Sequence, residues 1–379
     1  MTNTTPPPST APTPPSDIAV RTSPVAGIAL AAFLGIGLVS CGWLLASGKL
    51  TLLPGKAVSN DEVLEGEITH RIAKELAKAP LPEQAARLER AGTWLVLGDS
   101  GPRVRQGCEQ WLFISDEFKL DRHAQANAQA KQQAVIALQQ ALEKRGVTLL
   151  VSVVPDKSRI AASQLCDLPR PASLEPRIRN WAEGLQAAGV PVLDLTAGLQ
   201  PLGSDAFLRL DTHWSEAGAK AAAQAIAAKV AALGIEATPT RAFDEGQQAA
   251  APRPGDLVRL AGLDWLPTSL QPPQEWVQAT TFSEQTPGGD DLDDLFGDDN
   301  LPNVALIGTS FSRNSNFAGF LQQALSAPIG NFGKDGGEFS GAAKAYFDSA
   351  AFKQTPPKLL IWEIPERDLQ TPYAGDVGL

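Results

Sequence analysis

From residue 123 onward, the sequence alternates between stretches with helical periodicity and short runs that are apolar at nearly every position. The helical stretches are 124–145, 174–189, 215–233, 314–326 and 340–350, and the apolar runs are "VTLLVSVVP" (147–155), "VPVLDL" (190–195), "NVALIG" (303–308), "PIGNFG" (328–333) and "KLLIWEIP" (358–365). Strands that are apolar on both faces need a helical layer on each side. The pattern predicts an α/β fold, a three-layer sandwich around a mostly parallel sheet, with functional groups at the carboxyl ends of the strands.

The alternation fails between residues 234 and 302, which are rich in proline and end in the acidic tract "DDLDDLFGDDN" (290–300). We interpret this segment as long excursions over the sheet edge. The spacing of the aspartates matches no calcium-binding loop, so a solvated acidic loop is the better interpretation of the tract.

The N-terminal region combines a polar tail with an apolar run. Residues 1–24 are rich in proline, serine and threonine, which is typical of a disordered tail. No charged residue occurs from Thr22 to Gly48, and residues 25–47 are long enough to cross a bilayer as one helix. A cleavable signal and a lipoprotein box at Leu38–Cys41 are the alternatives, although the apolar run continues beyond that cysteine.

Residues 48–93 carry helical spacing with a Pro-Leu-Pro break, which predicts a stalk of two helices with His70 facing solvent. The apolar runs "TWLVLG" (93–98) and "QWLFIS" (110–115) then predict a β-hairpin that opens the domain 94–379. The intervening Gly-Asp-Ser, which ends at Ser100, resembles a hydrolase nucleophile block. Because Gly-Pro-Arg follows it rather than a helix, we interpret it as a plain turn.

The formal charge of −10 lies entirely in residues 49–379, because residues 1–48 contain one Asp and one Arg. Such a surface repels nucleic acid, so a nucleic-acid role is excluded. Two cysteines, Cys108 and Cys166, lie beyond the apolar run. They form either a disulfide in an oxidising compartment or two buried thiols.

Three residues carry the candidate chemistry. Asp211 and His213 stand two positions apart before a helix, where an acid orients an imidazole base and stabilises its cation. Ser310 follows an apolar strand and Gly308, at a turn that enters a helix, where backbone N–H groups stabilise an oxyanion. The alternatives are a helix-capping Asp with a buried His, a turn serine at 310, and Ser312 as the nucleophile.

Five segments, in this order, resemble the alginate O-acetyltransferase family of the AlgJ and AlgX type. They are "QWLFISDE" (110–117), "VVPDKSRI" (153–160), "LRLDTHWSEAGA" (208–219), "FGDDNLPNVALIGTSFS" (296–312) and "KLLIWEIPERDL" (358–369). The resemblance covers about residues 94–370 and implies an SGNH-hydrolase-like domain in which Asp-x-His precedes the nucleophile. The family's Asp, His and Ser fall on Asp211, His213 and Ser310. Gln110 replaces the usual glycine, and the membrane span favours the AlgJ type.

The resemblance implies a membrane-anchored O-acetyltransferase that needs no metal or cofactor and acetylates an exopolysaccharide in the periplasm as part of an export complex. A membrane-bound O-acyltransferase would supply the acetyl groups. An acetyl esterase using the same triad and a non-catalytic scaffold are the alternatives. An anionic polymer such as alginate would need a local basic patch, for which Lys157, Arg159 and Arg313 are candidates, whereas neutral cellulose would not.

Overall fold

The computed structural model describes residues 23–48, 63, 66–77, 80–285, 301–373, 375 and 377–379. The acidic tract 290–300 and nearly all of the predicted disordered tail lie outside these residues. The chain divides into two compact units, Met1–Leu88 and Glu89–Leu379. The predicted boundary between residues 93 and 94 falls inside one helix, α4 (Pro80–Leu97), and stays a prediction.

The first unit contains the apolar helix expected from the sequence. Helix α1 (Pro24–Ala46) begins at Ser23, whose hydroxyl accepts a hydrogen bond from the Ala26 N–H, and Pro24 occupies the first turn. Within the described residues, this is the one helix long and apolar enough to cross a membrane. Helix α3 (Glu67–Leu76) follows, with His70 exposed as predicted.

The prediction of a hairpin between residues 93–98 and 110–115 is wrong in its first strand. Helix α4 (Pro80–Leu97) continues through "TWLVL" and ends at Gly98, whose positive φ of 68° provides the left-handed turn. The helix continues through Gly92 because no proline occurs between Pro82 and Gly98. The hairpin instead pairs β1 (Val104–Gln106) with β2 (Leu112–Ile114).

A five-stranded parallel sheet forms the centre of the second unit, in the order β10-β9-β11-β3-β4. Its strands are β3 (Thr148–Val154), β4 (Val192–Asp194), β9 (Val304–Ile307), β10 (Gly330–Asn331) and β11 (Leu359–Pro365). Every predicted apolar run of the alternating region thus contains a strand, and the parallel sheet is confirmed.

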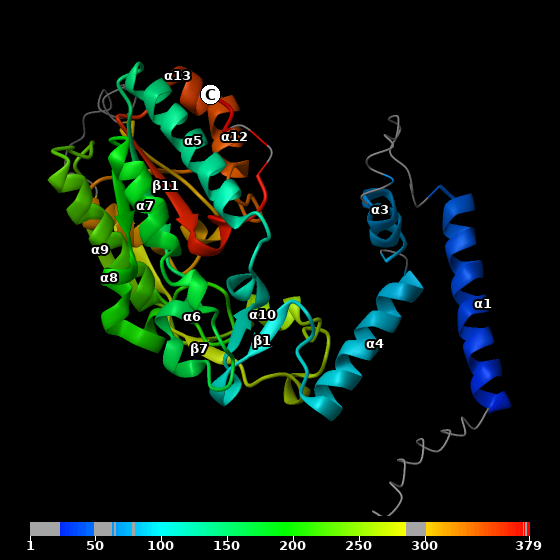
Figure 1. The fold of residues 1–379 in the computed structure, drawn as a ribbon. Helices are drawn as coiled ribbons and strands as arrows, with labels where there is room; N and C mark the ends of the chain where they lie inside the picture. The colour runs from blue at the N-terminus through cyan, green and yellow to red at the C-terminus, as the bar shows by residue number, and fades with distance from the viewer. Residues whose placement is uncertain are drawn as a thin grey trace, which may run out of the picture. The chain divides into compact units, whose positions relative to one another are not determined.

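Helices cover both faces of this sheet (Figure 1). One layer is formed by α5 (Ala124–Glu143), α7 (Arg177–Ala187), α12 (Gly341–Asp348) and α13 (Ala350–Gln354), and the other by α6 (Lys157–Ile160), α8 (Thr196–Leu199), α9 (Glu216–Ala232) and α11 (Phe317–Leu325). Alternate strand residues serve the two layers: Leu149 and Val151 pack in the first core, and Leu150 and Val154 in the second. The three-layer α/β sandwich is therefore confirmed.

Residues 234–285 are more ordered than an irregular excursion. They form two antiparallel ribbons, β5 (Phe243–Gln247) with β8 (Thr280–Glu284) and β6 (Ala251–Arg253) with β7 (Glu275–Val277), and the short helix α10 (Asp256–Leu260). Phe282 packs edge-on against Phe320 of α11, so the segment docks on a helical layer. The paired residues are 22 to 41 positions apart in the chain. Such pairing leaves no local signal, which is why the sequence interpretation missed it.

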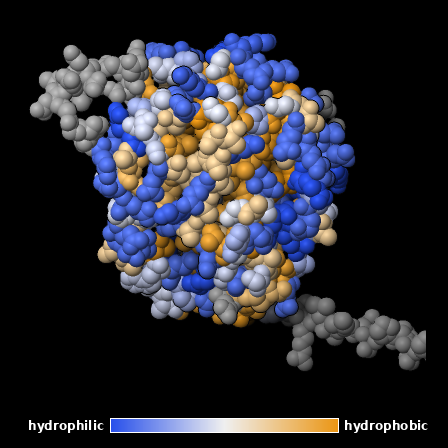
Figure 2. All heavy atoms as spheres, turned by 90° about the vertical axis from the view of Figure 1, so that its left-hand side faces the viewer, coloured by the Kyte–Doolittle hydropathy of each residue, from blue (hydrophilic) through white to orange (hydrophobic). Residues whose placement is uncertain are grey.

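A third, smaller core supports the loop before α9. It joins Ala91 of α4, Val104 and Leu112 of the hairpin, Leu210 and Leu257. On the side where α9 lies, the surface shows apolar side chains in bands between hydrophilic ones (Figure 2). Helix α9 contributes small side chains to this face, because its exposed positions are mostly alanines.

Candidate active site

The loop that follows β9 holds Ser310 at the carboxyl end of the sheet. Gly308 ends the strand, and Thr309 caps a short 3-10 turn of residues Ser310–Arg313, accepting a hydrogen bond from the Phe311 N–H at 3.3 Å. A side chain at Gly308 would collide with Glu363, because a Cβ there would lie 2.4 Å from its Oε2 atom. Glycine at position 308 therefore lets Glu363 approach the loop that presents Ser310 at the mouth of the site.

The side chain of Glu363 on β11 holds this loop in place through hydrogen bonds. Its carboxylate accepts hydrogen bonds from the Thr309 N–H (2.7 Å), the Thr309 hydroxyl and the Ser312 hydroxyl (3.0 Å). Burial raises the pKa of Glu363, while these hydrogen bonds act against that shift. The buried Ser312 hydroxyl is thus turned toward Glu363, and Ser310 presents the hydroxyl that meets the histidine.

The loop before α9 presents Asp211 and His213. A backbone bridge between Phe207 and Trp214 closes the loop, and the Ser215 hydroxyl caps α9 by accepting the Gly218 N–H at 3.1 Å. Because Ser215 is the cap, the alternative of a helix-capping Asp211 is wrong. Asp211 Oδ1 instead accepts hydrogen bonds from the His213 N–H (3.0 Å) and from Nδ1 of its ring (2.6 Å).

The fold brings the two loops together. His213 Nε2 lies 2.7 Å from Ser310 Oγ, although the two residues are 97 positions apart in the chain. Phe311 packs edge-on against both the His213 ring and the Trp214 ring, each at 5.0 Å between centroids. Asp211, His213 and Ser310 form one continuous hydrogen-bonded series, and its geometry is that of a charge-stabilised base beside a nucleophile.

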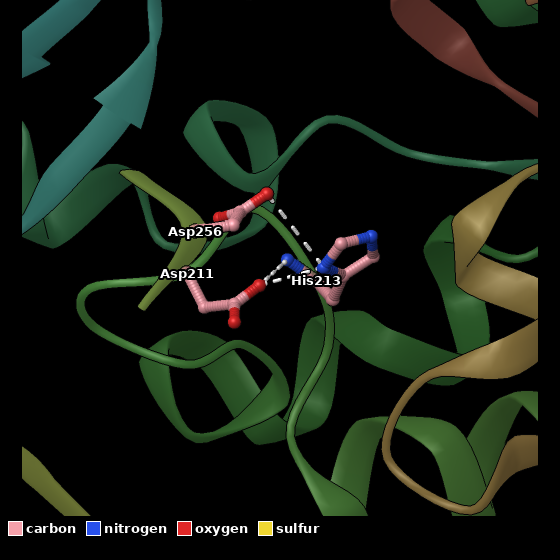
Figure 3. Close-up of side chains that lie close together, drawn as sticks. All are labelled: Asp211, His213 and Asp256. Atoms are coloured by element: carbon pink, nitrogen blue, oxygen red, sulfur yellow. Dashed lines mark hydrogen bonds and ion pairs between the residues drawn. The ribbon is translucent and has the colours of Figure 1, made fainter. Parts of the chain in front are cut away.

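Two further residues, Arg253 and Asp256, lie next to Asp211 and His213. Both come from the segment that the sequence interpretation treated as an excursion over the sheet edge. Arg253 donates through Nε and Nη2 to Asp211 Oδ2, each at 3.2 Å. Asp256 Oδ2 lies 3.9 Å from His213 Nδ1, the same ring nitrogen that Asp211 contacts (Figure 3). Asp256 Oδ1 accepts hydrogen bonds from the N–H and the hydroxyl of Thr212 at 2.7 and 3.0 Å.

The two carboxyl groups differ in their electrostatics. Burial would by itself raise the pKa of Asp211, but the hydrogen bonds from His213 and the positive charge of Arg253 outweigh it and hold that pKa well below its usual range. Burial and the neighbouring charge of Asp211 raise the pKa of Asp256. Asp211 is therefore the ionised partner of the histidine, and the second carboxyl group is the one that binds a proton more readily.

Asp211, His213 and Asp256 also offer ligand atoms within 4.8 Å of one another, as a metal site would. Both oxygens of Asp211 are already engaged, one by His213 and the other by the Arg253 guanidinium. A cation in this place would have to displace Arg253 and would meet its charge. The donor set thus fits a hydrogen-bonded relay better than a metal centre.

Lys157 is not part of a surface basic patch, contrary to the sequence-based hypothesis. Its side chain is buried, and Nζ donates to the carbonyl oxygens of Leu112 (2.6 Å), Arg209 (2.9 Å) and Asp211 (3.0 Å). Burial lowers the pKa of Lys157 to about 8. The ammonium group therefore ties the hairpin to the loop of Asp211 and is closed to a polymer.

Arg159 is also internal. It donates to Glu366 at 2.8 and 2.6 Å, within a cluster that includes Arg177 and the buried Asp156. Of the three basic candidates only Arg313 is open to solvent, with 56% of its side chain exposed and Asp335 3.8 Å away. The predicted basic patch is thus reduced to one of its members.

Cys108 and Cys166 form a disulfide, with their Cα atoms 5.2 Å apart. The alternative of two buried thiols is therefore wrong. The bond links the hairpin β1–β2 to the segment after α6. Ser100, the other sequence candidate for a nucleophile, lies in the turn after α4, where its buried hydroxyl donates to the Val104 carbonyl at 3.1 Å, as expected of a turn serine.

The fold and this geometry define an SGNH-like enzyme, and the comparison of sequences identifies its family. Residues 104–366 match the family of the SGNH hydrolase-like domain, acetyltransferase AlgX. The chain belongs to this family, and it is an O-acetyltransferase.

Particular relatives place the chain nearer the AlgJ type. It is 33% identical to the probable alginate O-acetylase AlgJ of Pseudomonas aeruginosa, over 92% of this chain and 90% of that protein. Its structure resembles the O-acetyltransferase domain of Pseudomonas putida AlgJ, with a TM-score of 0.61 and 32% identity, over 72% of this chain and 94% of that one. The alginate biosynthesis protein AlgX of Pseudomonas putida is 32% identical over 59% of this chain and 48% of its own length.

Proposed function

We propose that this O-acetyltransferase carries an acetyl group on Ser310 and passes it to a hydroxyl group of a polysaccharide. The observation that carries the proposal is the unbroken series of contacts from Asp211 to His213 (2.6 Å) and from His213 to Ser310 (2.7 Å). Distances of this size let an imidazole act as a general base toward a serine hydroxyl.

The chemistry follows from this arrangement in two half-reactions. His213 Nε2 takes the proton of Ser310 as Oγ attacks the acetyl carbonyl of the donor, and the imidazolium then returns that proton to the departing group. An acetyl-serine remains. In the second half, His213 takes a proton from the acceptor hydroxyl, whose oxygen attacks the acetyl carbon. The bond between that carbon and Ser310 Oγ then breaks, and the imidazolium returns the proton to Oγ. Asp211 stays ionised throughout and stabilises the imidazolium, and the N–H of Ser310 serves the oxyanion.

Alginate is the acceptor that the relatives support, since the proteins of Pseudomonas aeruginosa and Azotobacter vinelandii are both named as probable alginate O-acetylases. A cavity of about 370 Å³ opens beside the site and is lined by Arg253, Arg313, Asn314 and the edge of the β6–β7 ribbon, among others. The exposed guanidinium of Arg313 gives a uronate carboxylate a cationic contact on a domain that is otherwise acidic.

We further propose that α1 anchors the chain in the inner membrane and that the catalytic domain faces the periplasm. The length and apolarity of α1 support the anchor, and the disulfide supports an oxidising compartment. In that compartment a membrane-bound O-acyltransferase is the partner that delivers acetyl groups. The similarity to alginate biosynthesis proteins supports a place within a polysaccharide export complex.

The test is acetyl transfer by the full chain in detergent, with p-nitrophenyl acetate as donor and mannuronate oligosaccharides as acceptor. We expect acetylated oligosaccharides, detected by mass spectrometry, from the unaltered protein and from Ser283→Ala, which removes an exposed hydroxyl on β8. Ser310→Ala is expected to give none. Release of free acetate alone at saturating acceptor would replace the transferase with the esterase alternative, and full transfer by Ser310→Ala would remove the mechanism.

A further inference from the structure

Arg253 occupies a position that neither the triad chemistry nor the family comparison explains. It lies at the end of β6, in the segment Arg253-Pro254-Gly255-Asp256, and a quarter of its side chain (26%) is exposed. We propose that Arg253 is a positioning residue for the acyl transfer, which couples the triad aspartate to the nucleophile loop and so completes the site only when the β6–β7 ribbon is docked. The inference rests on the proposed function.

A closed ring of hydrogen bonds carries the proposal. From Arg253, one branch runs to Asp211 at 3.2 Å, then to His213 and to the Ser310 hydroxyl at 2.7 Å. The other branch runs from Arg253 Nη2 to Asn314 Oδ1 at 2.9 Å, and Asn314 Nδ2 donates to the Ser310 carbonyl at 2.8 Å. The guanidinium group thus contacts both Asp211, which orients the base, and Asn314, which binds the nucleophile loop. Because the group is planar and rigid, it fixes the orientation of the two loops relative to each other.

Close packing makes this placement specific. Gly255 lies so near the loop of Asp211 that a Cβ would sit 1.8 Å from the Leu210 carbonyl oxygen, so only glycine fits there. The Leu257 N–H donates to that same carbonyl at 3.3 Å, and Asp256 accepts the Thr212 N–H at 2.7 Å. The segment that carries Arg253 therefore contacts three consecutive residues of one loop, Leu210, Asp211 and Thr212.

The ribbon is fixed a second time through Glu275 of β7. Its two carboxylate oxygens accept the backbone N–H groups of Arg209 and Leu210, immediately before Asp211. Arg253 and Glu275 are paired across the β6–β7 ribbon, so both contacts depend on the same docking. If the ribbon left this surface, Asp211 would lose its contact with Arg253, and the backbone just before Asp211 would lose its contacts with Glu275.

The charge of Arg253 has a separate effect on the base. The charged and titratable groups around His213 are Asp211 on its own loop, Asp256 on α10, Arg253 on β6, Lys157 beneath the loop and Arg367 behind the Phe311 ring. The two carboxyl groups place negative charge around the ring, and the cations place positive charge there. Removal of the Arg253 charge makes the surroundings of the ring more negative, so the acidic limb of the rate profile is expected to move to higher pH.

Charge and geometry can be separated by two substitutions. Arg253→Met removes both, whereas Arg253→Lys keeps the charge and loses the fork that reaches Asp211 and Asn314 together. Arg259→Met is the matched control, because Arg259 is an exposed arginine on α10, six positions further along the same segment. The readout is kcat/KM for p-nitrophenyl acetate between about pH 5 and 9, together with the thermal midpoint, measured on the full chain in detergent.

We expect Arg253→Met to lower kcat/KM by about 10- to 100-fold and to move the acidic limb of the pH profile up by about one pH unit. Arg253→Lys should lose rate without moving the limb, and Arg259→Met should match the unaltered protein. The inference is overturned if Arg253→Met matches Arg259→Met in rate and limb, or if it lowers only the thermal midpoint.

Two controls keep these outcomes decisive. If Arg253→Met does not fold, Arg253→Lys decides, and a kcat/KM equal to that of the unaltered protein overturns the inference. Ser310→Ala separates this inference from the proposed function. An inactive Ser310→Ala beside a fully active Arg253→Met rejects the positioning role alone, whereas an active Ser310→Ala rejects the acyl-serine mechanism itself.

Discussion

The nucleophile loop, residues 308–314, and the ribbon segment, residues 243–284, hold their functional side chains by different means. The loop continues a strand whose four residues are all buried, and Glu363 of the neighbouring strand fixes it through three hydrogen-bonding groups. The strands of the ribbons are mostly exposed and reach the site through a few polar contacts, chiefly those of Arg253, Asp256 and Glu275.

This difference separates two kinds of task. Groups that exchange a proton or an acetyl group, Ser310 and His213, project from loops that the sandwich core and the N-terminus of α9 hold in place. Groups that influence the charge and the alignment of Ser310 and His213, such as Arg253, come from the two antiparallel ribbons. We therefore expect changes in the first set to remove activity and changes in the second set to weaken it.

The largest effect is expected at the base. His213→Ala or His213→Asn should lower acetyl turnover by about three orders of magnitude or more, because within the described residues His213 is the group that hydrogen-bonds the Ser310 hydroxyl. The thermal midpoint should stay nearly unchanged, measured by calorimetry beside the exposed control His70→Ala. A large fall in the midpoint with normal turnover per folded molecule would instead make His213 a structural residue.

The next effect is on stability, at the point where the core supports the loop of Asp211. Lys157→Met should lower the free energy of unfolding by roughly 3 kcal/mol, because three buried carbonyl groups lose their donor. Urea denaturation measures it, with the exposed Lys144→Met as control. Equal stability of the two variants would mean that Lys157 does not anchor the loop.

The same lysine also gives a pH dependence with a definite sign. Burial lowers its pKa to about 8, below the ordinary value of a lysine, so between these values the unfolded chain binds the extra proton. The free energy of unfolding of the unaltered protein should rise relative to Lys157→Met as the pH increases through that window. A difference that stays constant from pH 7.5 to 10 would contradict the buried charge.

The disulfide gives a loss of comparable size. Replacement of both Cys108 and Cys166 by serine should lower the free energy of unfolding by about 2–4 kcal/mol, because the bond closes a long loop with a sequence separation of 58. Calorimetry of the double variant measures the loss. The Asp211, His213 and Ser310 contacts do not involve this bond, so kcat/KM at a temperature well below the midpoint should remain. A loss of activity without a loss of stability would tie the bond to the site.

The smallest effect is expected in the ribbon. Glu275→Gln leaves one acceptor oxygen for two backbone N–H groups, so we expect a loss of about 1 kcal/mol and a fall in kcat/KM of only a few-fold. Activity assays on p-nitrophenyl acetate measure it. A loss as large as that of His213→Ala would erase the distinction between the two regions.

The sheet and the triad residues could be predicted because their signals are local. Apolar strands between helices fixed the parallel sheet, and short motifs named Asp211, His213 and Ser310 as candidates. Arg253 and Glu363 could not be found this way, since an arginine in a ribbon and a glutamate in a buried strand gain their meaning from contacts 42 and 54 positions away. Lys157 was wrongly assigned to the surface for the same reason, because nothing in the local sequence indicates that this lysine is buried.

The central claim is that Ser310 carries the acetyl group, and trapping of the acyl-enzyme tests it most directly. The protein is incubated with p-nitrophenyl acetate, quenched in acid, digested and analysed by tandem mass spectrometry. The account predicts a stoichiometric acetyl group on Ser310 that is absent in His213→Ala and that disappears when an acceptor oligosaccharide is added before the quench. An acetyl group on Ser312 or Ser100 but not on Ser310 would contradict it.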